Sequence, residues 1–153
     1  MSAEEVTAQL VDELTAAGRR LGPVLGLDVA DLIADRAAER APLLAAQLCT
    51  DGDDRLVAQT VEDLLAALWP TGEVDPAWWR TPVGARCAAS LGLGDTGAVT
   101  HSVAAAMLGV TPGTISQLTH RGTLARHPDG GVDRGAVLRR VAARWSCPNR
   151  GGS

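Results

Sequence analysis

The segment 102–120 constrains the fold more than any other part of the chain. Its sequence, SVAAAMLGVTPGTISQLTH, predicts two short helices joined by a tight turn. Gly109 stands at the turn, where a glycine adopts a positive φ without a steric penalty. Ser102 is the expected N-cap of the first helix. Thr111 is the expected N-cap of the second, with Pro112 in its first turn.

Apolar spacing indicates how these two helices pack. Ala104, Ala105 and Leu108 fall on one face of the first helix, and Ile115 and Leu118 point back toward it from the second. The opposite face of the second helix is polar and carries Gly113, Thr114, Ser116, Gln117 and His120. An ordinary helical corner has the same apolar pattern, so spacing alone leaves both interpretations open.

The residues that follow favour a DNA-binding unit. The run Arg-Gly-Thr-Leu at 121–124 leaves the second helix, and 125–132 predicts a small β-hairpin that turns on Asp-Gly-Gly. Asp133 is the expected cap of a further helix. Its inner face would hold Ala136, Val137, Val141 and Trp145.

The order helix, turn, helix, wing, helix over residues of about 100–144 resembles the excisionase-like and MerR-like winged helix-turn-helix proteins. The chain departs from full MerR-type regulators because no long coiled-coil helix or effector domain follows. The resemblance implies a mainly α fold, in which an N-terminal helical region precedes a winged helix-turn-helix with a small β-hairpin. It also implies that helix 111–121 reads the major groove of double-stranded DNA.

Each polar residue has an expected role in that interface. Gln117 suits bidentate bonds to an adenine edge, and Thr114, Ser116 and His120 reach base edges or phosphates. Gly113 lets the helix start approach the DNA backbone, where N–H groups at the Thr111 end hold a phosphate. The expected phosphate clamps are Arg121 and Arg126, the latter carried with His127 by the wing toward the minor groove.

Charge is divided along the chain in a way that fits this assignment. Residues 1–98 hold seven arginines against sixteen acidic residues, a balance of −9. Residues 99–153 hold seven arginines against two aspartates, a balance of +5, together with all three histidines. The positive part is the one expected to meet phosphates.

Upstream, residues 1–72 form an N-terminal helical region, a dimerisation or partner-binding region in this interpretation. The expected helix caps are Ser2 with Glu5, Asp28, and Asp53 or Asp54. The expected helix stops are Gly22-Pro23, Asp51-Gly52 and 69–72, and Pro42 is expected to break or kink the second helix. The inward stripes would be Val6, Leu10, Leu14 and Leu21; then Val29, Leu32, Ile33, Ala37, Leu43, Leu44 and Leu48; then Leu56, Val57, Thr60, Val61, Leu64, Leu65 and Leu68.

A Trp-rich connector and helix, 73–97, separates this region from the DNA-binding domain, 98–146, and a flexible tail, 147–153. Asp75-Pro76 and Thr81-Pro82 are each a cap followed by a first-turn proline, which predicts two abutting short helices. Trp78 and Trp79 lie between them; one is expected to face the N-terminal helices and the other the winged domain or a partner chain. The sequence is equally compatible with both tryptophans packing in an ordinary core. Residues 98–100 are expected to add an edge strand to the wing.

Several functional classes are not expected. Cys49, Cys87 and Cys147 match no metal spacing and suit reduced thiols in a cytoplasm, two of them in the core. The acidic start lacks a signal peptide, and no segment has the composition of a membrane span. The three histidines have no accompanying nucleophile or paired carboxylates, so neither an enzyme nor a cofactor is expected.

Three functional classes stay open. The first is a small bacterial transcriptional regulator that binds as a homodimer or a cooperative array. The second is an excisionase-like architectural or recombination-directing protein of a mobile element. The third is an antitoxin or adaptor whose N-terminal helices bind a protein partner.

Overall fold

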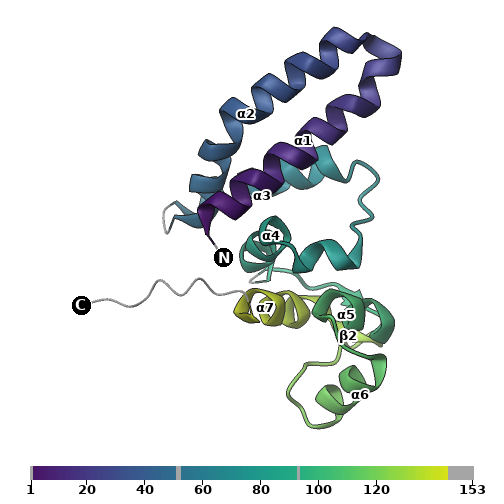
Figure 1. Cartoon of the computed structure of the whole chain (residues 1–153). Helices are drawn as coiled ribbons and strands as arrows, with labels where there is room; N and C mark the ends of the chain where they lie inside the picture. Colours follow the sequence, from purple (N-terminus) through teal and green to yellow (C-terminus); the bar gives the residue numbers. More distant parts are fainter. Residues whose placement is uncertain (1, 51–52, 93, 145–153) are drawn as a thin grey trace, which may run out of the picture. The chain divides into compact units, whose positions relative to one another are not determined.

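The computed structural model describes residues 2–50, 53–92 and 94–144. The expectations for Asp51-Gly52, Trp145, Cys147 and the tail lie outside these residues. The described chain is mainly helical with a small two-stranded antiparallel sheet, as expected, and divides into two compact units, 1–73 and 74–153 (Figure 1). The connector 73–97 falls almost entirely in the second unit.

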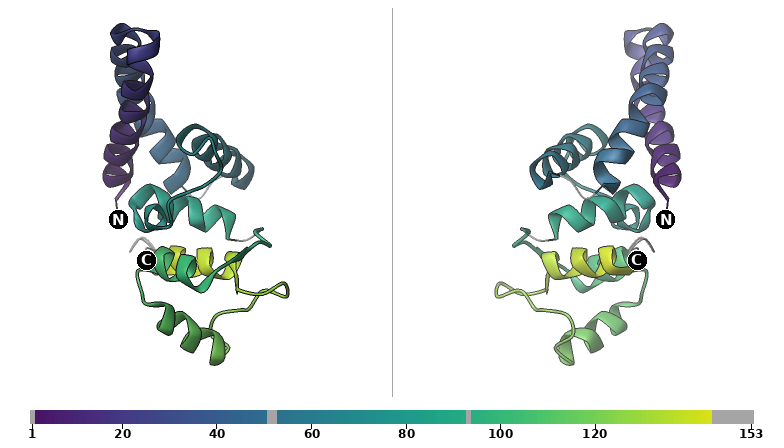
Figure 2. Two further views of the ribbon diagram at one scale, coloured as in Figure 1. Left: turned by 90° about the vertical axis from the view of Figure 1, so that its right-hand side faces the viewer. Right: turned by 90° about the vertical axis from the view of Figure 1, so that its left-hand side faces the viewer.

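The first unit is built on a hairpin of two long antiparallel helices, α1 (Ala3–Leu25) and α2 (Leu27–Cys49), with α3 (Asp54–Leu68) beside its open end (Figures 1 and 2). The expected capping box of Ser2 and Glu5 begins α1. Asp53 caps α3 by accepting the N–H of Arg55. Both caps are therefore confirmed.

One expected helix stop and one cap are wrong, and Pro42 does not break its helix. Helix α1 continues through Pro23, α2 continues through Pro42, and the N-cap of α2 is Gly26 rather than Asp28. Both prolines are exposed, so their rings project away from the hairpin interface. Packing holds the last turns of α1, because Gly18 lies so close to α2 that an added Cβ would come 2.7 Å from Cγ2 of Ile33.

Small residues, rather than the expected leucines, line the middle of this hairpin. Ala37, Ala41 and Ala45 recur every four residues on the buried face of α2. Helices that approach through small residues leave little room for leucine between them. Leu10 of α1 is buried as expected, but three leucines of this hairpin expected to face inward are exposed: Leu21, Leu32 and Leu43. Leu56 of α3, also expected inward, is exposed too.

The second unit consists of short helices packed around a common core. Its elements are a 3-10 helix η1 (Pro76–Arg80), α4 (Pro82–Leu91), β1 (Ala98–Val99), α5 (His101–Leu108), α6 (Pro112–His120), β2 (Val132–Asp133) and α7 (Arg134–Arg144). The expected caps Asp75 and Thr81 begin η1 and α4. Trp78 and Trp79 are both buried and meet edge to face, with ring centroids 5.4 Å apart. Cys87 is buried in α4, whereas Cys49 in the first unit is partly exposed.

Helix α5 begins two residues earlier than the sequence suggested. Thr100, not Ser102, is its N-cap: the chain is extended there, and the Thr100 hydroxyl accepts the N–H of Val103 at 3.2 Å. The correction follows from β1, because the strand ends at Val99 and places Thr100 in the extended conformation that an N-cap requires. Asp133 caps α7 as expected, accepting the N–H of Ala136 at 2.8 Å.

The sheet and the hairpin 125–133 adjoin one another. Strand β1 pairs with β2, with Val99 opposite Val132, which confirms the edge strand. On the other side of β2, Arg126 forms a single antiparallel bridge with Val132. The chain reverses at Gly130 and Gly131, both with positive φ, as the Asp-Gly-Gly sequence predicted.

Candidate nucleic-acid interface

The turn between α5 and α6 has the predicted geometry. Gly109 is left-handed, with φ 67° and ψ 36°, and the N–H groups of Gly109 and Val110 both bond to the carbonyl of Ala105. An added Cβ at this position would lie 3.0 Å from Nη1 of Arg80, at the flexible end of that side chain. The turn therefore fixes the direction in which α6 leaves α5.

The start of α6 is capped but still accessible. The Thr111 hydroxyl accepts the N–H of Thr114 at 3.2 Å and lies 3.0 Å from the Thr114 hydroxyl. Gly113 lies beside this cap, and its N–H has no partner among the residues that the structure describes. An added Cβ at Gly113 would meet only Oγ1 of Thr111, at 3.8 Å. The backbone at this helix end can thus be approached closely.

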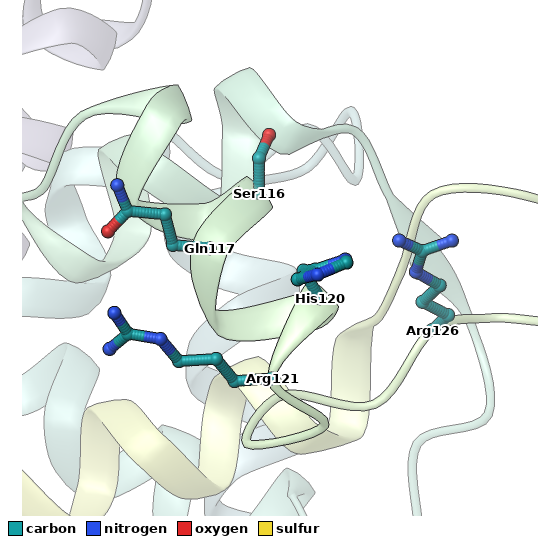
Figure 3. A pocket seen from close by; sticks show the side chains of 5 residues that line it. All are labelled: Ser116, Gln117, His120, Arg121 and Arg126. Atoms are coloured by element: carbon teal, nitrogen blue, oxygen red, sulfur yellow. The ribbon is translucent and has the colours of Figure 1, made fainter.

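Helix α6 presents a polar face opposite its buried one. Ile115 is fully buried and Thr119 nearly so, while Leu118 is partly exposed. The outward side chains of this helix and its C-terminus, together with one residue of the 125–133 hairpin, line an open hollow of about 520 Å³ (Figure 3). They are Ser116, Gln117, His120, Arg121 and Arg126. The structure thus brings five of the expected DNA-binding residues together.

Four of these side chains are available to a ligand. Gln117, His120, Arg121 and Arg126 are exposed, and none forms a hydrogen bond or ion pair with another described residue through its side chain. Ser116 donates its hydroxyl to the carbonyl of Pro112 at 3.2 Å and keeps its oxygen as an acceptor. We call these five residues the α6 face. In Figure 3, His120 extends toward the segment that carries Arg126, and Gln117 and Arg121 extend in the opposite direction.

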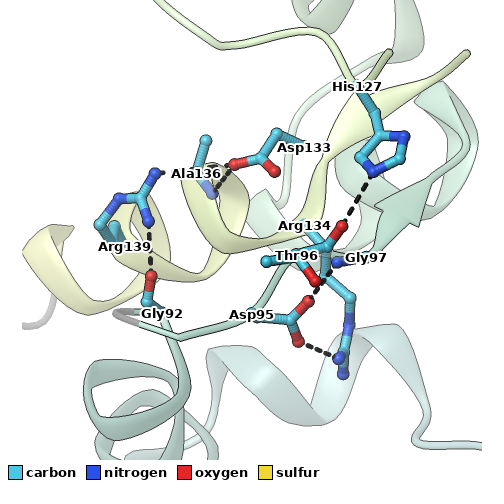
Figure 4. A network of polar contacts seen from close by, with 9 residues as sticks. All are labelled: Gly92, Asp95, Thr96, Gly97, His127, Asp133, Arg134, Ala136 and Arg139. Atoms are coloured by element: carbon cyan, nitrogen blue, oxygen red, sulfur yellow. Dashed lines mark hydrogen bonds and ion pairs between the residues drawn. The ribbon is translucent and has the colours of Figure 1, made fainter. Parts of the chain in front are cut away.

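His127 lies in a different environment, with a side chain only 15% exposed. Its Nε2 is 2.8 Å from the carbonyl oxygen of Thr96, and its Nδ1 accepts the N–H of Asp129 at 3.1 Å (Figure 4). Nε2 therefore carries the proton and donates it to Thr96. The bond at Nε2 holds the 125–133 hairpin against the loop before β1, and the bond at Nδ1 lies within the hairpin. No sequence signal connects His127 to Thr96, because the two residues are far apart along the chain.

Three arginines of α7 are also engaged within the second unit. Arg134 forms an ion pair with Asp95 and lies 5.7 Å from the ring centre of Trp79. Arg139 donates to the carbonyl of Gly92 (Figure 4), and Arg144 donates to that of Leu108. Among the described residues from 99 onward, the arginines without such partners are Arg121, Arg126 and Arg140.

No protein-family model matches the chain, and no curated protein or solved structure gives a significant match to it. Over the described ranges, no group of three or more His, Cys, Asp and Glu side chains is arranged to hold a metal ion. No helix in the same part of the chain is both long enough and apolar enough to cross a membrane.

Proposed function

We propose that the second unit binds double-stranded DNA as a winged helix-turn-helix, with α6 in the major groove, and that the protein is a small transcriptional regulator. One observation carries the proposal: Gln117, His120, Arg121 and Arg126 lie together on and beside the short helix α6, exposed and without side-chain partners among the residues that the structure describes. Exposed polar side chains of this kind at one helix face are what base and phosphate contacts require.

The α6 face divides into two kinds of contact. Gln117 offers a donor and an acceptor to an adenine edge, with Ser116 and His120 as neighbouring base or phosphate contacts. Arg121 and Arg126 flank them and bind phosphates on either side. The N–H of Gly113, at the positive end of the helix dipole, binds a further phosphate. Thr111 and Thr114 support this end by capping it.

The charges of the two units support the same assignment. Residues 74–153 hold nine arginines against four aspartates, whereas residues 1–73 hold five arginines against fourteen acidic residues. Phosphates attract the second unit and repel the first, which selects the surface that meets DNA. In this proposal His127 does not touch DNA; it positions the wing that carries Arg126.

A single module of this size buries little DNA surface, so we propose that the protein acts as a homodimer or a cooperative array. Sites one helical turn apart would be separated by about 34 Å. Such a regulator works in the cytoplasm and needs no cofactor.

Binding titrations at several salt concentrations test the proposal. Fragments selected from the source genome would serve as specific duplexes and shuffled sequence as the random one. We expect Gln117→Ala to cost about 1–3 kcal/mol on the selected duplex and little on the random one. Arg126→Ala should weaken both and reduce the salt slope by about one unit. Arg55→Ala, which removes an exposed arginine of the first unit, is the matched control and should change neither.

Two outcomes would contradict the proposal. Equal loss on both duplexes for Gln117→Ala would remove that residue from base recognition, and absence of duplex affinity at low salt would remove DNA binding altogether. A footprint over several sites with strong bending, near an attachment site, would instead favour the architectural role.

A further inference from the structure

The turn end of the α1–α2 hairpin is apolar and exposed. Val24 is 82% exposed and Leu27 75%, on either side of the turn at Gly26. Leu21 and Leu25 of α1 and Leu32 of α2 are exposed as well. We call these five apolar residues the hairpin tip. Exposed large apolar side chains that gather in one part of a surface, rather than scattering singly, mark interaction sites.

The third helix of the first unit, α3, does not cover the hairpin tip. Helix α3 lies beside the opposite end of the hairpin (Figures 1 and 2), where the Thr60 hydroxyl donates to Oε1 of Gln47 at 3.1 Å. No other helix is described in this unit.

The backbone of the hairpin tip is hydrogen-bonded through its turn. The N–H of Gly26 bonds to the carbonyl of Gly22 at 2.8 Å, and that of Val29 bonds to the carbonyl of Gly26 at 3.2 Å. Gly22 is seated against Ala30, since an added Cβ would come 3.3 Å from that methyl group. Backbone that is bonded in this way before association has less conformational entropy to lose when it associates.

Charges of opposite sign flank the hairpin tip on its two helices. Arg19 and Arg20 lie on the α1 side, and Asp28, Asp31 and Asp35 lie on the α2 side, all of them exposed. None forms an ion pair within the described part of this unit. A two-fold axis through the tip, perpendicular to the plane of the two helices, would set the arginines of one copy against the aspartates of the other, at both edges of the contact.

We infer that the hairpin tip binds the hairpin tip of a second copy of this chain, in a two-fold dimer. Apolar side chains fill the centre of the contact, and the Arg19–Arg20 edge of each copy meets the Asp28–Asp31 edge of the other. The sign pattern is complementary to itself, which favours a second copy over an unrelated protein. The inference concerns the first unit alone and does not depend on DNA binding.

A matched pair of variants locates the contact. Leu32 and Leu43 both lie on α2 and are both 56% exposed, but Leu43 is about 16 Å further along the helix, outside the tip. Sedimentation of the full chain over a concentration series should show a dimer. Leu32→Lys should raise its dissociation constant by about tenfold or more, and Leu43→Lys should not. Val24→Ser, which adds no charge, should act like Leu32→Lys.

A charge exchange then tests the orientation. The R19E/R20E variant sets acidic edges against each other, and the D28R/D31R variant does the same with basic edges, so each should be monomeric alone. Mixing the two in equal amounts should restore a dimer, which also shows that both variants are folded.

The inference is overturned if the wild-type chain stays monomeric into the millimolar range. It is equally overturned if Leu43→Lys dissociates the dimer as strongly as Leu32→Lys, or if the charge-exchanged mixture does not associate. If the chain dimerises in this way but does not bind duplex DNA, this inference is supported and the DNA proposal is refuted. If the chain is monomeric but binds duplex DNA, the DNA proposal is supported and this inference is refuted.

Discussion

Replacing Gly113 by alanine separates the stability of α6 from its proposed contact with DNA. The residue lies in the first turn of the helix, and the structure places nothing nearer than 3.8 Å to an added Cβ. Its φ is not in the left-handed region, so alanine fits the backbone without strain.

The Gly113→Ala change is therefore expected to make the free energy of folding more favourable and the free energy of DNA binding less favourable. Alanine reduces the conformational freedom of the unfolded chain, which should stabilise the fold by up to about 0.4–1 kcal/mol. If the N–H of Gly113 bonds to a phosphate, the methyl group keeps that phosphate away and removes a hydrogen bond to a charged group. Such a bond contributes about 1.5–3 kcal/mol, which corresponds to a loss of about 10- to 100-fold in affinity.

Thermal unfolding and duplex titration of the same Gly113→Ala preparation measure the two terms. We expect an unchanged or higher melting temperature together with weaker binding on specific and random duplexes alike, because a phosphate carries no sequence. Gly94→Ala is the control, since an added Cβ there also meets nothing within 4 Å and the position lies outside the α6 face. Undiminished affinity of Gly113→Ala would refute the close approach of DNA to this helix end.

Three further predictions concern how the second unit is held together. Gly109→Ala forces a left-handed conformation on a residue with a Cβ and should cost about 1–2 kcal/mol of unfolding free energy in urea titrations; a neutral result would contradict the turn geometry. Gly84→Ala should lower the unfolding free energy by about 3 kcal/mol in the same assay, because its Cβ would overlap the backbone carbonyl of Trp78. Wild-type stability of this variant would show that α4 and η1 can move apart freely. Asp95→Asn should lower stability by about 1–2 kcal/mol through loss of the ion pair with Arg134, and retention of the wild-type melting temperature would mean that this pair contributes nothing.

Local chemistry explains most of what the sequence predicted correctly. The caps Ser2, Asp53 and Thr111 and the left-handed Gly109 were identifiable because each acts on backbone groups only a few residues away. The α6 face was identifiable for the same reason, since Ile115 fixes which side of a short helix is buried.

The misassigned features depended on residues distant in sequence. Exposed Pro23 did not end its helix, because Gly18 and the rest of the α1–α2 contact hold the final turns in place. The bond between His127 and the Thr96 carbonyl, which the sequence did not predict, is likewise made across a fold that no local pattern reveals.

The sequence by itself thus determined where η1, α4, α6 and α7 begin, where the chain turns between α5 and α6, and which half of the chain carries positive charge, because these depend on neighbouring residues and on composition. Only the tertiary structure decided which cations are available, leaving Arg121 and Arg126 exposed while Arg134 is paired with Asp95. It also decided that the alanines of α2 are buried and that Leu32 is exposed. Burial and pairing are properties of contacts between distant segments, so they are fixed only when the chain has folded.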